Sequence, residues 1–142
     1  MDRRTLSAEY SDIGWKLIEE MPELAYLRGA DISISFLKSE HAKKTKGKII
    51  HAQCEKVSEK YKWGIPADFT ITVFEPNCME FDDEQMRILI FHELLHIGQV
   101  NGTWSTVPHD LEDFKVIIKK YGADWNLPKG EQGEDEEHHA GE

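Results

Sequence analysis

Cysteine and long apolar runs are both scarce in this 142-residue sequence. The two cysteines, Cys54 and Cys78, are not spaced as a metal clip, so we expect both to be reduced and to act as small hydrophobic residues. No stretch approaches the roughly 18–20 consecutive apolar residues of a membrane span, and residues 1–12 contain no apolar segment that could serve as a signal peptide. These absences argue against a disulfide framework and a membrane span, and they favour the cytoplasm as the compartment.

Positive charge is also scarce, because 17 Lys and Arg stand against 27 Asp and Glu, for a formal net charge of -10. Half of that excess lies in residues 129–142, which carry -5 and leave -5 on residues 1–128. An acidic body disfavours a domain that binds by neutralising phosphates. One basic stretch, interrupted by Glu40, is an exception to this acidic character. We expect it to be a solvated connector, with a local anion contact as the alternative. It comprises Lys38, Lys43, Lys44, Lys46 and Lys48.

The composition predicts one globular domain followed by a short tail. With 39% hydrophobic and 31% charged residues, the chain is long enough to bury a core of its own. From Pro128 onward the sequence is dense in charge and poor in hydrophobic residues, which is typical of disorder. We therefore expect a domain over residues 1–128 and a disordered acidic tail over residues 129–142.

Hydrophobic periodicity predicts a mixture of helices and strands. Apolar residues recur at helical spacing behind Ser7, which is a suitable N-cap. Alternation of apolar and polar residues predicts strands at 32–37 and 68–75, and the second strand carries threonines on the face opposite its apolar residues. The expected helices lie at 7–20, between Gly47 and Gly64, at 83–100, and from Pro108 to Gly122, with a loop at 103–107.

The ends of the last two helices carry recognisable signals. Asp82, with Gln85 three residues later, forms a capping-box pattern at the start of the third helix. We interpret Asn101-Gly102 as its stop and Gly122 as the end of the fourth helix. The apolar stripes are Ile50, Cys54, Val57 and Tyr61 on the second helix, and Leu111, Phe114, Ile118 and Tyr121 on the fourth.

The segment His92-Glu93-Leu94-Leu95-His96 carries the chemistry of this sequence. Residues four apart on a helix project from one face with Cβ atoms about 5–6 Å apart, so two imidazoles can bind one zinc ion at about 2.0–2.1 Å. Glu93 is rotated by about 100° from His92, which makes it a candidate base that reaches a water on the metal. The flanking residues are almost all apolar, and a buried helix must give these polar side chains partners. The alternative is a pair of core histidines bonded to backbone, with Glu93 at the surface.

A catalytic zinc site needs a third protein ligand. His109 lies 13 residues after His96, at the start of the next expected helix, where the helix dipole keeps an imidazole neutral. We expect His109 to be this ligand. The alternatives, which could also accept a histidine N–H or merely stabilise the helix N-terminus, are Asp110, Glu112 and Asp113.

Four further histidines are not expected to hold a catalytic metal. His41 lies in the basic stretch, and His51 lies on an expected helix far from the motif in sequence. His138 and His139 can bind metal from solution, but a disordered tail cannot hold a catalytic geometry. All four are therefore expected to be ordinary polar positions or adventitious metal binders.

Together these residues resemble the putative phage metallopeptidase family, a zincin-like group. The resemblance covers about residues 30–125 and rests on Asp68-Phe-Thr-Ile-Thr-Val73, His92-Glu-Leu-Leu-His96, Pro108-His-Asp-Leu-Glu-Asp-Phe114 and Tyr121-Gly-Ala-Asp-Trp125. It implies an α+β fold, a single compact zincin-like domain whose small sheet packs on helices, with the HExxH motif on an active-site helix. It also implies that His92, His96 and His109 bind Zn2+, that Glu93 is catalytic, and that a phage or prophage encodes the chain.

The resemblance implies a zinc-dependent metallopeptidase that hydrolyses peptide bonds in a peptide or protein, in the cytoplasm of the host cell. Zinc would lower the pKa of its bound water toward about 7, and Glu93 would take the proton and pass it to the leaving amine. Strand 68–75 would lie along the cleft, with an unpaired edge that holds an extended substrate. Tyr61 and Tyr121 are candidates for stabilising the oxyanion, but both fit apolar stripes and we favour core positions for them.

Three other functions would use the same residues. A catalytically inactive, zinc-stabilised phage protein would act as a protein-binding module, with a side chain such as Asp110 or Glu112 closing the fourth coordination position. Hydrolysis of a non-peptide amide or a peptidoglycan cross-link would need only a different pocket. Proteolysis of DNA-bound proteins fits the expected fold but is disfavoured by the acidic charge. We expect neither a membrane nor a nucleic acid as a partner.

Overall fold

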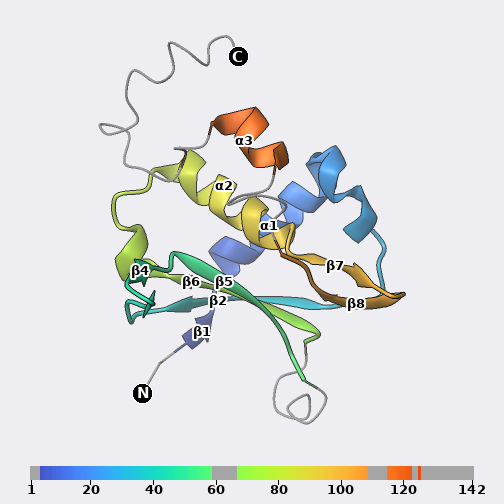
Figure 1. Cartoon of the computed structure of the whole chain (residues 1–142), viewed down its shortest axis with the longest axis horizontal. Coiled ribbons are helices and arrows are strands. Elements are labelled where there is room, and N and C mark those ends of the chain that lie inside the picture. Colours follow the sequence, from blue (N-terminus) through green and yellow to red (C-terminus); the bar gives the residue numbers. More distant parts are fainter. Residues whose placement is uncertain (1–3, 59–66, 109–114, 123–124, 126–142) are drawn as a thin grey trace.

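The computed structural model describes residues 4–58, 67–108, 115–122 and 125, and it shows a mixed α+β chain. The helices lie on one side of a small sheet, with α3 beyond α2 (Figure 1). The α+β class and the small sheet expected from the sequence are therefore confirmed. The helical elements are α1 (Ala8–Glu20), α2 (Asp83–Leu94) and α3 (Lys115–Tyr121), with the 3-10 segments η1 (Pro22–Leu27) and η3 (Glu75–Cys78).

Four strands form the main sheet in the order β1-β2-β6-β5. β6 (Phe69–Phe74) is parallel to β2 (Ile34–Ser39) and antiparallel to β5 (Ala52–Lys56), while β1 (Arg4–Leu6) is antiparallel to β2. All six residues of β6 are buried, since this strand has a neighbour on each side and helices over one face. β6 is thus the centre of the sheet.

The two faces of β6 differ as the alternation of its sequence predicts. Its apolar side chains belong to the core beneath the helices and its threonines lie on the opposite face; the former are Phe69, Ile71 and Val73, and the latter Thr70 and Thr72. The strands expected at 32–37 and 68–75 are confirmed. The unpaired edge expected for strand 68–75 is wrong, because β2 and β5 are hydrogen-bonded to it on its two sides. The edge on this side of the sheet belongs to β5.

The first expected helix is confirmed as α1. Ser7 is its N-cap, because the Ser7 hydroxyl accepts a hydrogen bond from the Tyr10 backbone N–H at 3.1 Å. The buried side of α1 packs on β2 and α2. Gly14 lies on this side, and a Cβ at Gly14 would lie 2.3 Å from Cζ of Phe36. The glycine therefore permits the close approach of α1 to β2.

The second helix, expected between Gly47 and Gly64, is wrong over residues 47–58, which are the part of it that the structure describes. The segment forms a hairpin of β3 (Lys44–Thr45) and β4 (Lys48–Ile49), followed by strand β5. Its apolar spacing fits a helix, but residues 52–56 also alternate small apolar with polar side chains, as a strand does. Pairing with β6 decides between the two, because it satisfies the backbone groups on one edge of β5 along its length.

The third expected helix, at 83–100, is confirmed at its start and wrong at its end. α2 begins after the N-cap Asp82 and ends at Leu94. The chain continues as a hairpin of β7 (Ile97–Val100) and β8 (Thr103–Thr106). The loop expected after this helix is therefore largely a strand.

A two-residue turn explains the β7–β8 hairpin. Asn101 and Gly102 have φ of 54° and 81°, the left-handed values of a tight turn between antiparallel strands. The dipeptide interpreted as a helix stop is thus a hairpin turn. Tyr26 of η1 fixes the hairpin, since its hydroxyl donates to the Ile97 carbonyl at 2.6 Å and its ring stacks on Trp104. Burial raises the pKa of Tyr26 to about 12, so this hydroxyl keeps its proton.

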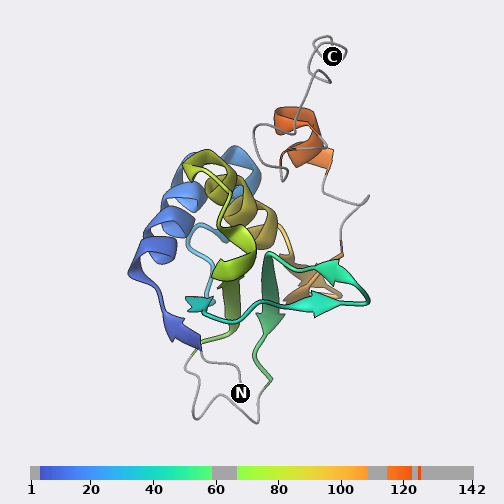
Figure 2. The ribbon, with the colours of Figure 1, turned by 90° about the vertical axis from the view of Figure 1, so that its left-hand side faces the viewer.

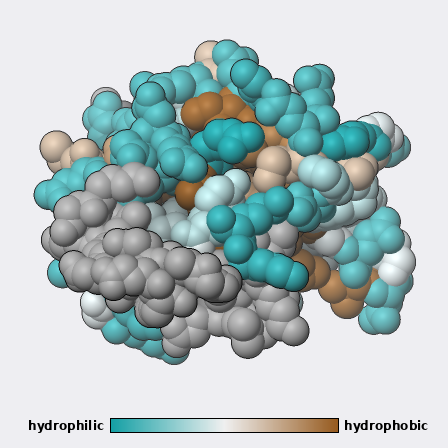
Figure 3. Space-filling model, turned by 90° about the horizontal axis from the view of Figure 1, so that it is seen from above, coloured by the Kyte–Doolittle hydropathy of each residue, from teal (hydrophilic) through white to brown (hydrophobic). Residues whose placement is uncertain are grey.

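The fourth expected helix is described over its last part, as α3. Ile117 is fully buried, Tyr121 is half-buried against the core, and Gly122 ends the helix with a φ of 91°. On the face shown in Figure 3, hydrophilic residues cover much of the described surface. Across the described part of the chain, no helix has the length and apolar character needed to cross a membrane. Outside it lie the stripe positions Leu111 and Phe114, the side chain of Ile118 and the tail over 129–142.

Candidate metal site

α2 carries the first three residues of the motif, His92 to Leu94, and ends before Leu95 and His96, so the expectation that the whole motif lies on a helix is met only in part. The helix is anchored at its start, and most of its middle and last turns are buried. The Asp82 carboxylate accepts the Gln85 N–H at 2.8 Å, and the Gln85 side chain accepts the Asp82 N–H at 3.0 Å, as the capping-box pattern predicts. The Gln85 amide also donates to the Trp125 carbonyl at 2.9 Å. The apolar side chains of the middle and last turns of α2 are buried in the core. The polar groups at its end are therefore held in place with it.

The two histidines of the motif lie side by side at the end of α2. His92 is in the last turn of the helix, and His96 is two residues beyond its end. A 3.1 Å hydrogen bond from the His96 N–H to the Glu93 carbonyl continues the winding of the chain past the last helical residue. The imidazole centroids are 5.2 Å apart, with ring planes inclined by 62°. The four-residue spacing thus brings the rings together, even though the helix ends between them.

A backbone carbonyl orients the His96 ring. Nδ1 of His96 lies 2.6 Å from the Val107 carbonyl oxygen, and the Val107 N–H donates to the His96 carbonyl at 2.7 Å. Because a carbonyl oxygen can only accept, Nδ1 carries a proton, and in a neutral imidazole the lone pair is then on Nε2. In metal-binding histidines one ring nitrogen is commonly held by a second group in this way while the other binds the metal.

Glu93 is buried, with 5% of its surface exposed. Its Oε2 atom lies 4.0 Å from Nε2 of His92. The alternative in which both histidines are mere core residues places Glu93 at the surface, so the burial of Glu93 counts against it. A buried carboxylate beside two imidazoles is instead suited to act on a molecule bound next to them.

A cavity of about 390 Å³ lies beside these residues. Its walls come from the end of α2, the edge strand β5, the base of the β3–β4 hairpin and the end of β8. The sequence does not predict the lining residues outside the motif, because it predicts a helix and loops for the segments that carry them. The alternation along β5 is the signal that could have found some of them. They include Lys43, Gln53, Cys54, Thr106 and Val107.

Cys54 lies on β5 near the motif. Burial raises the pKa of its thiol, and the carboxylates of Glu93 and Glu55 raise it further. Burial and the carboxylate of Glu75 raise the pKa of Cys78 to about 12. Neither cysteine is in a disulfide, as the sequence predicts. Both thiols therefore stay protonated near neutral pH and act as small hydrophobic groups.

We expect a thiol reagent such as DTNB to react at least about tenfold more slowly with the folded protein than with the unfolded chain at about pH 8. The thiolate is the reactive species, and folding suppresses it at both cysteines. A Cys78→Ala variant isolates Cys54, and a Cys54→Ala variant is its matched counterpart. Fast reaction of the folded Cys78→Ala variant would contradict a protonated Cys54.

The structure brings together two of the three expected metal ligands, His92 and His96. Within the part of the chain that it describes, no group of three His, Cys, Asp or Glu side chains is arranged to hold a metal ion. The third ligand therefore stays a prediction. His109 and its alternatives Asp110, Glu112 and Asp113 all lie outside the described residues.

His41 and His51, which the sequence does not assign to metal binding, are not among the residues that line the cavity. His41 is exposed, and His51 stacks on Phe81 with ring centroids 4.9 Å apart. Burial lowers the pKa of His51, so its ring is neutral at neutral pH. The oxyanion candidate Tyr121 packs against the core, whereas Tyr61, His138 and His139 lie outside the described residues.

Fold and site define the class of this protein: a mixed α+β chain with a His-Glu-x-x-His segment beside a cavity at the edge of its sheet. The family model described as "Putative phage metallopeptidase" matches residues 4–129 of the chain. The chain therefore belongs to that family, as its motifs suggest. No curated protein and no solved structure matched the chain in the same comparisons.

Proposed function

We propose that this protein is a zinc-dependent metallopeptidase that hydrolyses peptide bonds in a peptide or protein substrate. The observation that carries the proposal is a buried Glu93 carboxylate beside two imidazoles with centroids 5.2 Å apart, all lining one cavity. The family supports it at a coarser level, because its description implies a hydrolase that uses a metal.

The histidines fit a metal in two respects. The Val107 carbonyl holds Nδ1 of His96, so that Nε2 is the nitrogen that would coordinate a metal. The His92 side chain is 13% exposed, and its ring meets that of His96 edge-on at the cavity. We propose that His92, His96 and His109 hold Zn2+, since three histidine nitrogens suit a catalytic zinc. Zinc bound there would supply a Lewis acid that polarises the substrate carbonyl and acidifies water.

Glu93 is the proposed general base. It would accept a proton from the attacking water at a carboxylate oxygen and return that proton to the departing amine. Its burial keeps bulk water away from the carboxylate, so that the proton passes between the reacting groups. Because α2 is held in the core, the carboxylate is positioned before the substrate arrives.

We propose that the substrate lies along β5. In the described part of the chain, β6 is the one strand that pairs with β5, and Ala52, Gln53 and Cys54 line the cavity. An extended peptide can add to such a strand through backbone hydrogen bonds. The substrate-binding edge that we expected on strand 68–75 is therefore proposed for β5 instead, because strand 68–75 is internal to the sheet.

Zinc content tests the proposed site. Elemental analysis should find about one zinc per wild-type chain, and a His109→Ala variant should lose most of it, because two ligands hold zinc far more weakly than three. Both chains are compared without residues 129–142, since His138 and His139 can bind zinc from solution.

His41→Ala is the matched control, because His41 is exposed and is not a lining residue of the cavity; this variant should keep its zinc. Near-zero zinc in the wild type would overturn the metal site. Full zinc in His109→Ala would move the third ligand to Asp110, Glu112 or Asp113.

A further inference from the structure

We propose that the β3–β4 hairpin selects substrates by favouring acidic side chains on the peptide that enters the cavity. This selection rests on the proposed peptidase function and adds a substrate class to it. The basic stretch expected to be a solvated connector is exposed at four of its five lysines, but Lys38 lies in β2, and Lys44, Lys46 and Lys48 are folded into this hairpin beside the candidate metal site. The positive charge of these lysines therefore lies on an ordered element of the fold.

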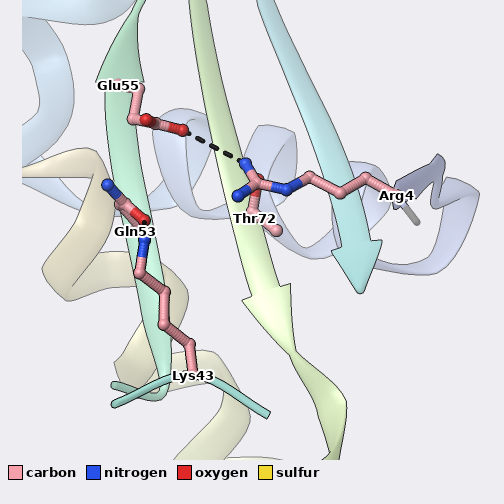
Figure 4. A network of polar contacts seen from close by, with 5 residues as sticks. All are labelled: Arg4, Lys43, Gln53, Glu55 and Thr72. Atoms are coloured by element: carbon pink, nitrogen blue, oxygen red, sulfur yellow. Dashed lines mark hydrogen bonds and ion pairs between the residues drawn. The ribbon is translucent and has the colours of Figure 1, made fainter. Parts of the chain in front are cut away.

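The hairpin projects from the sheet next to β5 (Figure 2). Lys43 and Thr45 line the same cavity as His92 and Glu93. Nζ of Lys43 donates to Oε1 of Gln53 at 2.8 Å, which holds the ammonium group against β5 (Figure 4). Among the described residues that line the cavity, Lys43 is the one Lys or Arg and Glu93 the one carboxylate.

Asn77 fixes the base of the hairpin. Its side-chain amide donates to the carbonyls of Lys43 and Ile50, at 3.0 and 2.8 Å. The Ile50 N–H in turn donates to the Lys43 carbonyl at 3.0 Å. At the tip, Lys46 and Gly47 have φ of 53° and 80°, so the two strands are joined by a tight two-residue turn. The base of the hairpin is thus fixed where Lys43 and Thr45 line the cavity, and Lys44, Lys46 and Lys48 lie on its strands and its turn.

The charge of the hairpin opposes that of the rest of the chain. Lys44, Lys46 and Lys48 lie in the hairpin with Lys43 at its base, and residues 43–49 contain no acid, in a protein whose formal net charge is -10. Lys44, Lys46 and Lys48 are exposed, and none of the three makes an ion pair with another described residue. Most of the chain would repel an acidic peptide and this hairpin would attract it, which favours its entry at the cavity. The same acidic character disfavours nucleic acid, which carries a charge on every phosphate.

The register of β5 indicates which substrate positions are selected. Successive side chains of an extended peptide point to opposite faces of the sheet that it joins. Cys54 shares the helix side with its pairing partner Ile71, and Gln53 shares the opposite side with Thr72 (Figure 4). Peptide side chains on the Gln53 side would meet Lys43 and the hairpin. We therefore expect the acidic preference at alternate substrate positions.

Matched peptides test this selection. Pairs of fluorogenic peptides that differ by Glu against Gln at a single position are compared for kcat/KM with the full-length zinc protein. The wild type should favour the acidic peptide by about fivefold at low ionic strength, and the preference should vanish at about 1 M salt, where the screening length is about 3 Å.

A variant with Lys44→Gln, Lys46→Asn and Lys48→Gln should lose this preference, and asparagine is suited to the left-handed backbone at position 46. Lys16→Gln with Lys119→Gln, at exposed lysines of α1 and α3, is the matched control and should retain it. An unchanged preference in the hairpin variant, or no preference in the wild type, would overturn the selection.

Peptide binding separates this inference from the proposed function. Anisotropy of labelled peptides is measured on Glu93→Gln chains with and without the hairpin substitutions. A charge preference in binding that the hairpin substitutions remove, without hydrolysis by the wild type, would sustain the hairpin's role and refute the peptidase. Tighter binding of a single-stranded oligonucleotide than of the acidic peptide, lost in the hairpin variant, would overturn the selection and assign the lysines to nucleic acid.

Discussion

A Glu93→Gln variant is expected to hydrolyse peptides at least about 100-fold more slowly than the wild type while binding the same amount of zinc. Glutamine has nearly the shape of glutamate, so the packing of this buried position is kept. Its amide cannot take up the proton of the attacking water, and the acid–base step is lost. Measuring kcat/KM together with zinc by elemental analysis checks both halves of the expectation.

The matched control is Glu80→Gln, at an exposed glutamate before α2, which should change neither the rate nor the zinc content. Undiminished hydrolysis by Glu93→Gln would show that another group is the base. If the wild type binds zinc and hydrolyses none of the peptides, a zinc-stabilised protein-binding module becomes the better description.

The second large effect is on stability, because Gly14→Ala is expected to lower the free energy of unfolding by about 2 kcal/mol. The added methyl group would lie 2.3 and 2.5 Å from two carbons of the Phe36 ring. Overpacking costs up to about 3 kcal/mol, which exceeds the gain of about 1 kcal/mol that alanine brings to a helix interior. Urea unfolding followed by circular dichroism measures the difference.

Asp12→Ala, at an exposed site of the same helix, is the control and should change stability by less than about 0.5 kcal/mol. Adding Phe36→Leu to Gly14→Ala should recover part of the loss, because a smaller side chain relieves the contact. A Gly14→Ala protein as stable as the wild type would show that α1 can move away from β2 without cost.

Patterns among neighbouring residues correctly predict those helices and strands whose positions are set by interactions between neighbouring residues. The N-cap at Ser7 and the capping box at Asp82 place the starts of α1 and α2 correctly, and alternation places β6. Residues 52–56 fit either a helical stripe or a strand, and only hydrogen bonds to β6 settle the choice. Gly14, which weakens the prediction of a helix, is explained by a contact with a distant residue. Such contacts between distant segments are what a single sequence does not reveal.

The candidate site likewise has one part that the sequence predicts and another part that it does not. The spacing within one short segment predicts that His92 and His96 approach each other, and the structure places their rings together. Val107 and Cys54 reach the site through strand pairing, which no local pattern specifies. His109 is a prediction from spacing along the chain, and it lies outside the described residues.

The helix that forms much of the core and the hairpin that carries the exposed lysines are different elements of the fold. α2 contributes His92 and Glu93 of the motif and also much of the hydrophobic core, so substitutions along it alter folding and chemistry together. The lysines of the β3–β4 hairpin are exposed, and the hydrogen bonds of Asn77 at its base do not depend on their side chains. Mutations at the hairpin tip can therefore accumulate with little effect on stability. Among chains that diverge from a common ancestor, we expect substrate preference to change through this hairpin while α2 changes slowly.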